Sequence, residues 1–301
     1  MSVRTLSRPA PVRVGGTADI LVAACLWGTT GTVRTFVDGA SNVSIAASRI
    51  VLGGGLLLAF AVLTARAGLV RLLSTHRNRA LVALGAVAIA VYQAAFFVAA
   101  ARTGVAVGTV VTIGSAPAFA GVLGAVTGQA RLTPRWLAAT GGAVAGCAAL
   151  VGGGESAGVE PIGVGLALLS GLAYAVYATV ASAFISGGED DRAVVAALFG
   201  TAAIVLLPVL ATTGPGWMTT PSGALIILYL GGITTAGGYM LFARGLRTTP
   251  ATTATTLTLA EPAVAAVLGV VVLNEQLGGL ALAGLALLAV SLVVLIMPAR
   301  K

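Results

Sequence analysis

The chain has 301 residues, of which 58% are hydrophobic and 9% are charged, and its formal net charge is +8 at pH 7. A soluble domain usually carries about 25% charged residues and cannot hide this much apolar surface from water, so the composition excludes a single soluble globular domain. In a soluble protein this charge would suggest nucleic acid, but in a membrane protein basic residues gather in cytoplasmic loops, and we expect no nucleic-acid partner.

Ten apolar stretches follow one another along the chain, separated by short polar segments. A helix needs about 20 apolar residues to cross the hydrocarbon core of a bilayer. The first stretch follows a basic segment, as in a signal peptide, but it is too long and ends without a clear cleavage site, so we expect it to be retained. The sequence predicts membrane-spanning helices at about residues 18–37, 43–64, 80–101, 104–127, 136–151, 162–185, 193–213, 222–243, 251–273 and 279–297.

The basic residues are unevenly distributed between the predicted loops. If the N-terminus lies in the cytoplasm, Arg102 alone falls on the outer side, and Arg34 and Arg49 fall within spans. This asymmetry follows the positive-inside rule and predicts a multi-pass plasma-membrane protein with both termini in the cytoplasm. The fourteen basic residues on the cytoplasmic side are Arg4, Arg8, Arg13, Arg66, Arg71, Arg77, Arg79, Arg131, Arg135, Arg192, Arg244, Arg247, Arg300 and Lys301.

The two halves of the chain resemble each other when the sequence is aligned with itself at an offset of 145 residues. Arg102-Thr103 then coincides with Arg247-Thr248, and Pro117-Ala118 coincides with Pro262-Ala263. About eleven of thirty positions match in this region. The pattern indicates an internal repeat.

Each half, at residues 18–152 and 162–298, holds five predicted spans. An odd number of spans forces the two halves into opposite orientations. The predicted fold is therefore an all-α membrane protein of ten transmembrane helices, arranged as two inverted five-helix repeats (5+5). Inverted repeats place a substrate site near the membrane midplane and allow alternating access.

Three of these spans carry short motifs. The first span reads Leu26-Trp27-Gly28, the fourth carries a central Pro117, and the ninth reads Leu259-Ala260-Glu261-Pro262, followed by Val272-Leu273-Asn274-Glu275. With these motifs, the chain resembles the EamA-like transporters of the drug/metabolite transporter superfamily over nearly its whole length. The resemblance implies export of small metabolites, commonly amino acids or their derivatives, and of toxic compounds in some members. Ala116 stands where a first-half counterpart of Glu261 would lie, so a symmetric two-carboxylate mechanism is not expected.

Glu261 is the candidate coupling or structural carboxylate. It is predicted near the bilayer centre, where a charge costs at least about 2.5 kcal/mol. It is either a proton site or substrate contact, or a neutral carboxyl that fixes helix packing. Pro117 and Pro262 are candidate helix kinks, each freeing a carbonyl four residues earlier, at Ile113 and Thr258. These carbonyls either line a polar cavity or belong to ordinary kinks satisfied by threonine hydroxyls.

Arg34 and Arg49 occupy the outer parts of the first two spans. They either extend toward the outer surface or face a central cavity and bind a substrate carboxylate. Aromatic rings within spans, together with a few polar anchors, are typical of a small-molecule site, although each ring taken alone is better explained by packing. The remaining candidate cavity residues are Trp27, Tyr92, Gln93, Phe96, Tyr174, Tyr177, Tyr239 and Thr258.

The spacing Gly142-x3-Gly146 favours close helix packing. The chain has one histidine, His76, and lacks a phosphate-binding loop, so we expect no metal, no cofactor and no enzyme activity. The leading hypothesis is a secondary active exporter of small metabolites that works by alternating access, with inward proton flow as a candidate driving force. An uncoupled uniporter or facilitator and an exporter of toxic compounds are the alternatives. Expected partners are a small-molecule substrate, protons and membrane lipid, and both a monomer and a homodimer are compatible with the sequence.

Overall fold

A computed structural model describes residues 14–37, 39–103, 105–130, 132–152, 160–273 and 278–297. Asp38, Asn274 and Glu275 lie outside these ranges. All elements in the described part of the chain are helical: α1 (Val14–Gly28), α2 (Thr30–Arg34), α3 (Asn42–Thr64), α4 (Arg66–Leu72), α5 (His76–Thr103), α6 (Val105–Val126), α7 (Pro134–Gly152), α8 (Pro161–Ser186), α9 (Asp191–Thr212), η1 (Pro215–Thr219), α10 (Pro221–Ile227), η2 (Leu228–Gly237), α11 (Gly238–Gly245), α12 (Ala251–Leu257), α13 (Ala260–Leu273) and α14 (Gly279–Ile296).

Within these ranges, eight helical stretches are long and apolar enough to cross a membrane. Helices satisfy all their interior backbone groups locally, which an apolar sequence in lipid requires. The prediction of an all-helical, multi-pass membrane protein is therefore confirmed. The first and fifth predicted spans fold as α1 with α2 and as α7, and neither is among the eight. The count of ten spans and the inverted 5+5 arrangement stay predictions.

Three of the predicted spans are not continuous α-helices. The first is interrupted at Thr29, the eighth contains the π-helical segment η2, and the ninth is interrupted between Leu257 and Ala260. The last break precedes Pro262, as expected for proline. However, the carbonyl of Thr258 accepts the amide of Glu261 at 3.0 Å, so the alternative in which this carbonyl lines a cavity unpaired is wrong.

Pro117 behaves differently from its counterpart. Helix α6 continues through Pro117 without interruption. The two prolines therefore differ at the level of secondary structure, and the kink at Pro117 stays a prediction. The break in the ninth stretch is specific to the second half of the chain.

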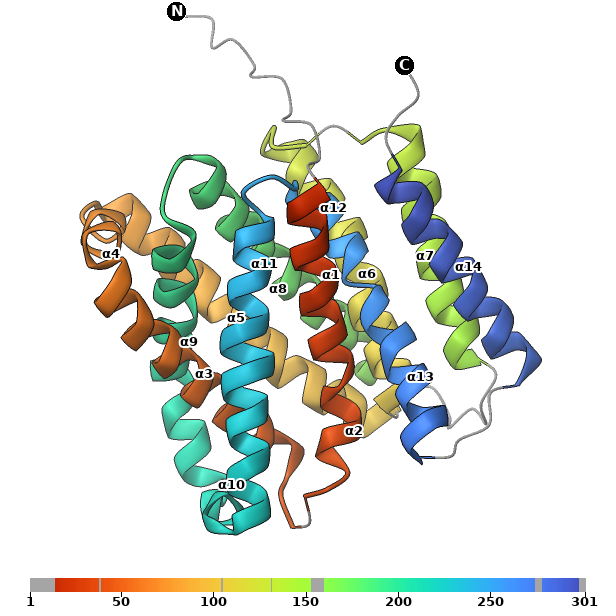
Figure 1. Cartoon of the computed structure of the whole chain (residues 1–301), viewed down its shortest axis with the longest axis horizontal. Coiled ribbons are helices and arrows are strands. Elements are labelled where there is room, and N and C mark those ends of the chain that lie inside the picture. Colours follow the sequence, from red (N-terminus) through yellow and green to blue (C-terminus); the bar gives the residue numbers. More distant parts are fainter. Residues whose placement is uncertain are drawn as a thin grey trace, which may run out of the picture.

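The helices pack in pairs that are far apart in sequence. Helix α3 packs along α9, α5 along α8, and α7 along α14, while α1 contacts both α11 and α13. Figure 1 shows the α7–α14 pair at one edge of the molecule and α1 beside α11 and α13. It also shows the start of α1 and the end of α14 at the same end of the bundle.

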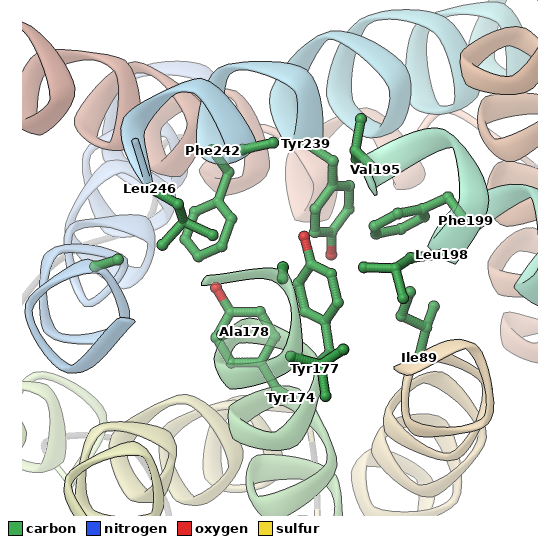
Figure 2. Packing of buried hydrophobic residues seen from close by; sticks show 14 of the residues in the cluster. Ile89, Tyr174, Tyr177, Ala178, Val195, Leu198, Phe199, Tyr239, Phe242 and Leu246 are labelled. Atoms are coloured by element: carbon green, nitrogen blue, oxygen red, sulfur yellow. The ribbon is translucent and has the colours of Figure 1, made fainter. Parts of the chain in front are cut away.

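A group of aromatic rings belongs to the larger of the two buried clusters in the described part of the chain. Rings from α8, α9 and α11 converge on one another in Figure 2. The ring centroids of Phe199 and Tyr239 lie 4.1 Å apart, and those of Trp27 and Tyr239 lie 4.6 Å apart. Large rings in such arrangements contribute both apolar burial and specific ring–ring attraction. We define the aromatic layer as Trp27, Tyr174, Tyr177, Phe199, Tyr239 and Phe242.

Candidate functional site

One cavity brings together most of the residues that the sequence singled out. Its volume is about 190 Å³, and it lies between α1, α2, α3, α5, α6, α8, α11 and the α12–α13 break. Of the predicted site residues, Tyr177 and Pro117 do not line it. Those that do are Trp27, Arg34, Arg49, Tyr92, Gln93, Phe96, Tyr174, Tyr239, Thr258, Glu261 and Pro262.

Glu261 lines this cavity from the first turn of α13. The interruption before Pro262 ends α12 at Leu257, so the chain can present a carboxylate at the start of a new helix. Arg49 lines the same cavity as Glu261. The structure gives this carboxylate no hydrogen bond and no ion pair within 4.0 Å among the residues it describes. An ionisable group in this position is available to a proton or to a substrate.

Arg49 and Arg34 both lie against the cavity. Arg49 is half-buried on α3, and its Nε–H donates to the hydroxyl of Thr235 at 3.1 Å. Arg34 is half-buried in the last turn of α2. The sequence left two alternatives open, extension toward the outer surface or a position facing the cavity. In the structure both arginines line the cavity. The cavity then combines two guanidinium groups with one carboxylate.

Trp27 connects the cavity to the second half of the chain. Its indole N–H donates to the carbonyl of Thr234 at 2.8 Å. The neighbouring Gly28 allows α1 to approach α13 closely, because a Cβ at Gly28 would lie 2.8 Å from the carbonyl oxygen of Glu261. The Trp-Gly motif therefore places an aromatic ring in the cavity wall and a glycine at the contact with the α13 backbone.

Helix α5 contributes an aromatic and polar wall. Tyr92, Gln93 and Phe96 line the cavity, and the ring centroids of Tyr92 and Tyr174 lie 5.4 Å apart. Ser170 donates its hydroxyl hydrogen to the carbonyl of Tyr92 at 2.9 Å, which ties α8 to α5 beside the cavity. Gln93 is buried, with an exposed fraction of 4%.

Tyr177 lies in the aromatic layer and not in the cavity wall, so its predicted role as a lining residue has no support in this geometry. Its ring is 6.0 Å from that of Tyr174. Among the described residues, the hydroxyls of Tyr174 and Tyr177 have no hydrogen-bond partner. The aromatic layer closes one side of the cavity, because Trp27, Tyr174 and Tyr239 belong to both.

Sequence reasoning missed several residues of this site. Thr30, Thr109 and Thr112 also line the cavity, and Thr235 holds Arg49 from behind it. The glycine pairs that flank Thr234-Thr235 were a signal that this span is not an ordinary α-helix. No sequence signal pairs Arg49 with a residue 186 positions away.

A second charged cluster lies outside the cavity, at the helix ends that carry the basic residues. Asp19 of α1 forms an ion pair with Arg244 of α11, and Arg71 of α4 lies 3.1 Å from Glu189. Arg244 is expected in a loop but lies in the last turn of α11. The guanidinium of Arg192, hydrogen-bonded to Asp190, lowers the pKa of that carboxyl. Within the described ranges, no group of three or more histidine, cysteine or acidic side chains could hold a metal ion.

Comparison with known proteins gives a consistent result for family and fold. The family model described as the EamA-like transporter family matches residues 16–152 and again residues 161–297. The "Uncharacterized transporter YwfM" of Bacillus subtilis is 39% identical over 286 residues, which cover 94% of each chain. A solved structure described only as the crystal structure of a protein shares the fold, with a TM-score of 0.80 at 18% identity, covering 94% of this chain and 97% of the other.

Proposed function

Because the chain belongs to the EamA-like transporter family, we propose that it is a secondary active exporter of small metabolites, such as amino acids or their derivatives. Transport proceeds by alternating access, in which the cavity opens in turn to each side of the membrane. The protein resides in the plasma membrane with both termini in the cytoplasm, as the distribution of basic residues favours.

The proposal includes an inverted arrangement of two five-helix halves, residues 18–152 and 162–298. Two consecutive matches to one family model support it. The cavity is compatible with this arrangement, because α1, α2, α3, α5 and α6 of the first half and α8, α11 and α13 of the second half contribute to its wall. Rocking one half against the other would change the side on which such an interfacial cavity opens.

A single observation carries the functional proposal: Glu261 and Arg49 line one aromatic cavity between the two halves of the chain. Opposite charges without a direct ion pair are suited to a substrate that has its own polar groups. The volume of about 190 Å³ is below the roughly 300–1,000 Å³ of pockets for drug-sized ligands. The size therefore favours a small metabolite over a large toxic compound.

Proton coupling is the second part of the proposal. It is supported by the absence of a partner for the Glu261 carboxylate among the described residues. A carboxylate that takes up a proton from one side and releases it to the other would couple export to inward proton flow. The alternative is an uncoupled uniporter or facilitator, in which Glu261 binds substrate or fixes the structure without exchanging protons during the cycle.

Reconstitution tests both parts. Metabolites released by cells with and without the protein identify candidates, and purified protein in proteoliposomes is then assayed with them. We expect wild-type transport to respond to an imposed proton gradient, and Glu261→Gln to transport at a rate independent of pH. Counterflow retained in Glu261→Gln would show that its fold and substrate site remain intact. An unchanged pH profile in this variant would contradict coupling through Glu261, and the absence of transport of any candidate would contradict the export function.

A further inference from the structure

Thr235 lies behind the cavity wall, and its hydroxyl takes part in two hydrogen bonds, one as donor and one as acceptor. The side chain is fully buried, with an exposed fraction of 0%. Its O–H donates to the carbonyl of Leu230 at 2.8 Å, and its oxygen accepts the Nε–H of Arg49 at 3.1 Å. The hydroxyl is thus oriented by the backbone of η2 and in turn orients the guanidinium.

The π-helical register of η2 makes this contact possible. In an α-helix a threonine hydroxyl reaches the carbonyl three or four residues earlier, whereas Thr235 reaches Leu230, five residues earlier. Helix α3 approaches η2 closely at Gly53, where a Cβ would lie 2.6 Å from the Cβ of Thr235. Gly53 is one turn after Arg49 and on the same helix face. The close approach therefore places Thr235 within reach of Arg49.

This contact leaves the distal edge of the guanidinium available. A guanidinium carries five N–H donors, and among the described residues Arg49 has one hydrogen-bond partner, Thr235, which accepts from Nε. In the described part of the chain, its two Nη groups have no hydrogen-bond partner, and Glu261 does not pair with it within 4.0 Å. A pair of parallel N–H donors fits two oxygens of a carboxylate or another oxyanion.

We infer that Thr235 is a positioning residue, which holds Arg49 so that its Nη edge binds an oxyanion group of the substrate in the cavity. The inference deepens the transport function proposed above and rests on it. It assigns the anionic end of the substrate to α3 and makes the π-helical segment a determinant of specificity. Thr235 itself does not touch the substrate.

The matched variants are Thr235→Val, Thr235→Ser and Thr234→Val. Valine keeps the shape of threonine but removes the hydroxyl, and serine restores it. Thr234 is equally buried and donates to the same Leu230 carbonyl at 2.7 Å, but its hydroxyl has no bond to Arg49. Thr234→Val therefore controls for the loss of a hydroxyl within η2.

The first measurement uses proteoliposomes with two acid–amide pairs, L-leucine with L-leucinamide and L-phenylalanine with L-phenylalaninamide. We expect Thr235→Val to raise the KM of a transported acid about tenfold, as expected for losing a hydrogen bond that orients a charged group, with less than twofold change in maximal rate. The KM of the amide should not change. Thr235→Ser and Thr234→Val should stay within about threefold of wild type. An equal KM for the acid in wild type and Thr235→Val would overturn the inference.

The second measurement does not require transport. Butanedione modifies accessible arginines, and mass spectrometry of the purified full-length protein gives the rate at Arg49 relative to Arg34. We expect benzoate, a simple carboxylate, to slow modification of Arg49 at least threefold in wild type and Thr235→Ser, and to give no protection in Thr235→Val. Equal protection in Thr235→Val would also overturn the inference.

The two measurements separate the two proposals. Protection of Arg49 that depends on Thr235, in a protein that transports no candidate metabolite, would support oxyanion binding by Arg49 and refute the export function. Transport of the acid with a KM that does not change in Thr235→Val would refute the positioning role of Thr235 and leave the export function supported.

Discussion

The indole N–H of Trp27 donates to the carbonyl of Thr234 at 2.8 Å, joining two residues 207 positions apart. The bond connects α1 to the π-helical segment η2. Thr235, the residue after Thr234 in this segment, accepts a hydrogen bond from Arg49. Passing from π-helical to α-helical hydrogen bonding skips one carbonyl of the backbone, and a carbonyl in a membrane interior needs a donor. Trp27 supplies such a donor to this segment and also forms part of the cavity wall.

Replacing Trp27 with phenylalanine tests the contribution of this hydrogen bond. Phenylalanine keeps a ring next to Tyr239, whose centroid lies 4.6 Å from that of Trp27, but it cannot donate. We expect a loss of about 1 kcal/mol in the free energy of unfolding. This value lies between the ~0.6 kcal/mol average for interhelical hydrogen bonds in membranes and the ~1–3 kcal/mol cost of leaving a buried polar group without a hydrogen-bond partner. Unfolding by titration with sodium dodecyl sulfate measures it. Equal stability of wild type and Trp27→Phe would show that the bond contributes nothing.

The start of α9 carries a titratable cap. Asp190 accepts the backbone amides of Arg192 at 2.9 Å and of Ala193 at 3.4 Å, and its pKa is lowered by the hydrogen bond from the Arg192 guanidinium. A lowered pKa in the folded state means that the ionised carboxylate favours folding. This contribution is complete at neutral pH, starts to fall near the ordinary aspartate pKa of about 3.9, and is lost as the pH drops through the lowered value.

We therefore expect Asp190→Asn to keep the cap but to reduce the loss of stability between pH 6 and pH 3, because asparagine caps as well as aspartate and does not titrate. Asp190→Ala should lose about 0.5–2 kcal/mol at pH 7. Thermal unfolding in detergent across this pH range measures both effects. A wild-type pH profile in Asp190→Asn would assign the acid sensitivity to other carboxylates.

Much of the helical framework follows from the sequence, because apolar stretches in lipid must satisfy their backbone groups internally. The grouping of Arg49 and Glu261 in one cavity also agrees with a general rule, since ionisable groups within membrane helices face the interior of the bundle. The break before Glu261 could be expected from Pro262, but Pro117 has the same local signal and leaves α6 continuous. Proline alone therefore does not decide whether a helix is interrupted.

Other features depend on rotation and register, which hydropathy does not encode. Tyr174 and Tyr177 lie one turn apart on α8, yet only Tyr174 lines the cavity, because a small rotation of the helix decides between the cavity and the aromatic layer. The π-helical segment η2 is bonded by Trp27 and Arg49, which are contributed by helices distant in sequence. Sequence patterns within a single span could not predict it.

The contact between α7 and α14 depends on glycine. A Cβ at Gly146 would lie 2.7 Å from the backbone nitrogen of Leu288 and 2.8 Å from the carbonyl oxygen of Gly284, whereas a Cβ at Gly141, on the same helix, has no atom within 4 Å. We expect Gly146→Ala to destabilise the protein by about 1–3 kcal/mol through overpacking against backbone. Gly141→Ala should be neutral or stabilise it by up to about 1 kcal/mol, because alanine favours helix. Detergent unfolding measures both, and equal effects would contradict a packing role specific to Gly146.

The inverted arrangement predicts opposite exposure of the two arginines that the internal repeat aligns. Arg102 lies in the last turn of α5 with its guanidinium 2.5 Å from Glu160, and Arg247 follows α11 with its guanidinium 4.0 Å from Asp191. In a background with Cys25 and Cys147 replaced by alanine, we expect an impermeant maleimide to label Arg102→Cys only from outside intact cells. It should label Arg247→Cys only in inverted vesicles, in the same way as Arg71→Cys, which is the cytoplasmic reference. Five predicted spans lie between residues 102 and 247, and an odd number of spans places the two residues on opposite sides of the membrane. Labelling of both residues from the same side would therefore contradict the inverted repeat and, with it, alternating access by rocking of two inverted halves.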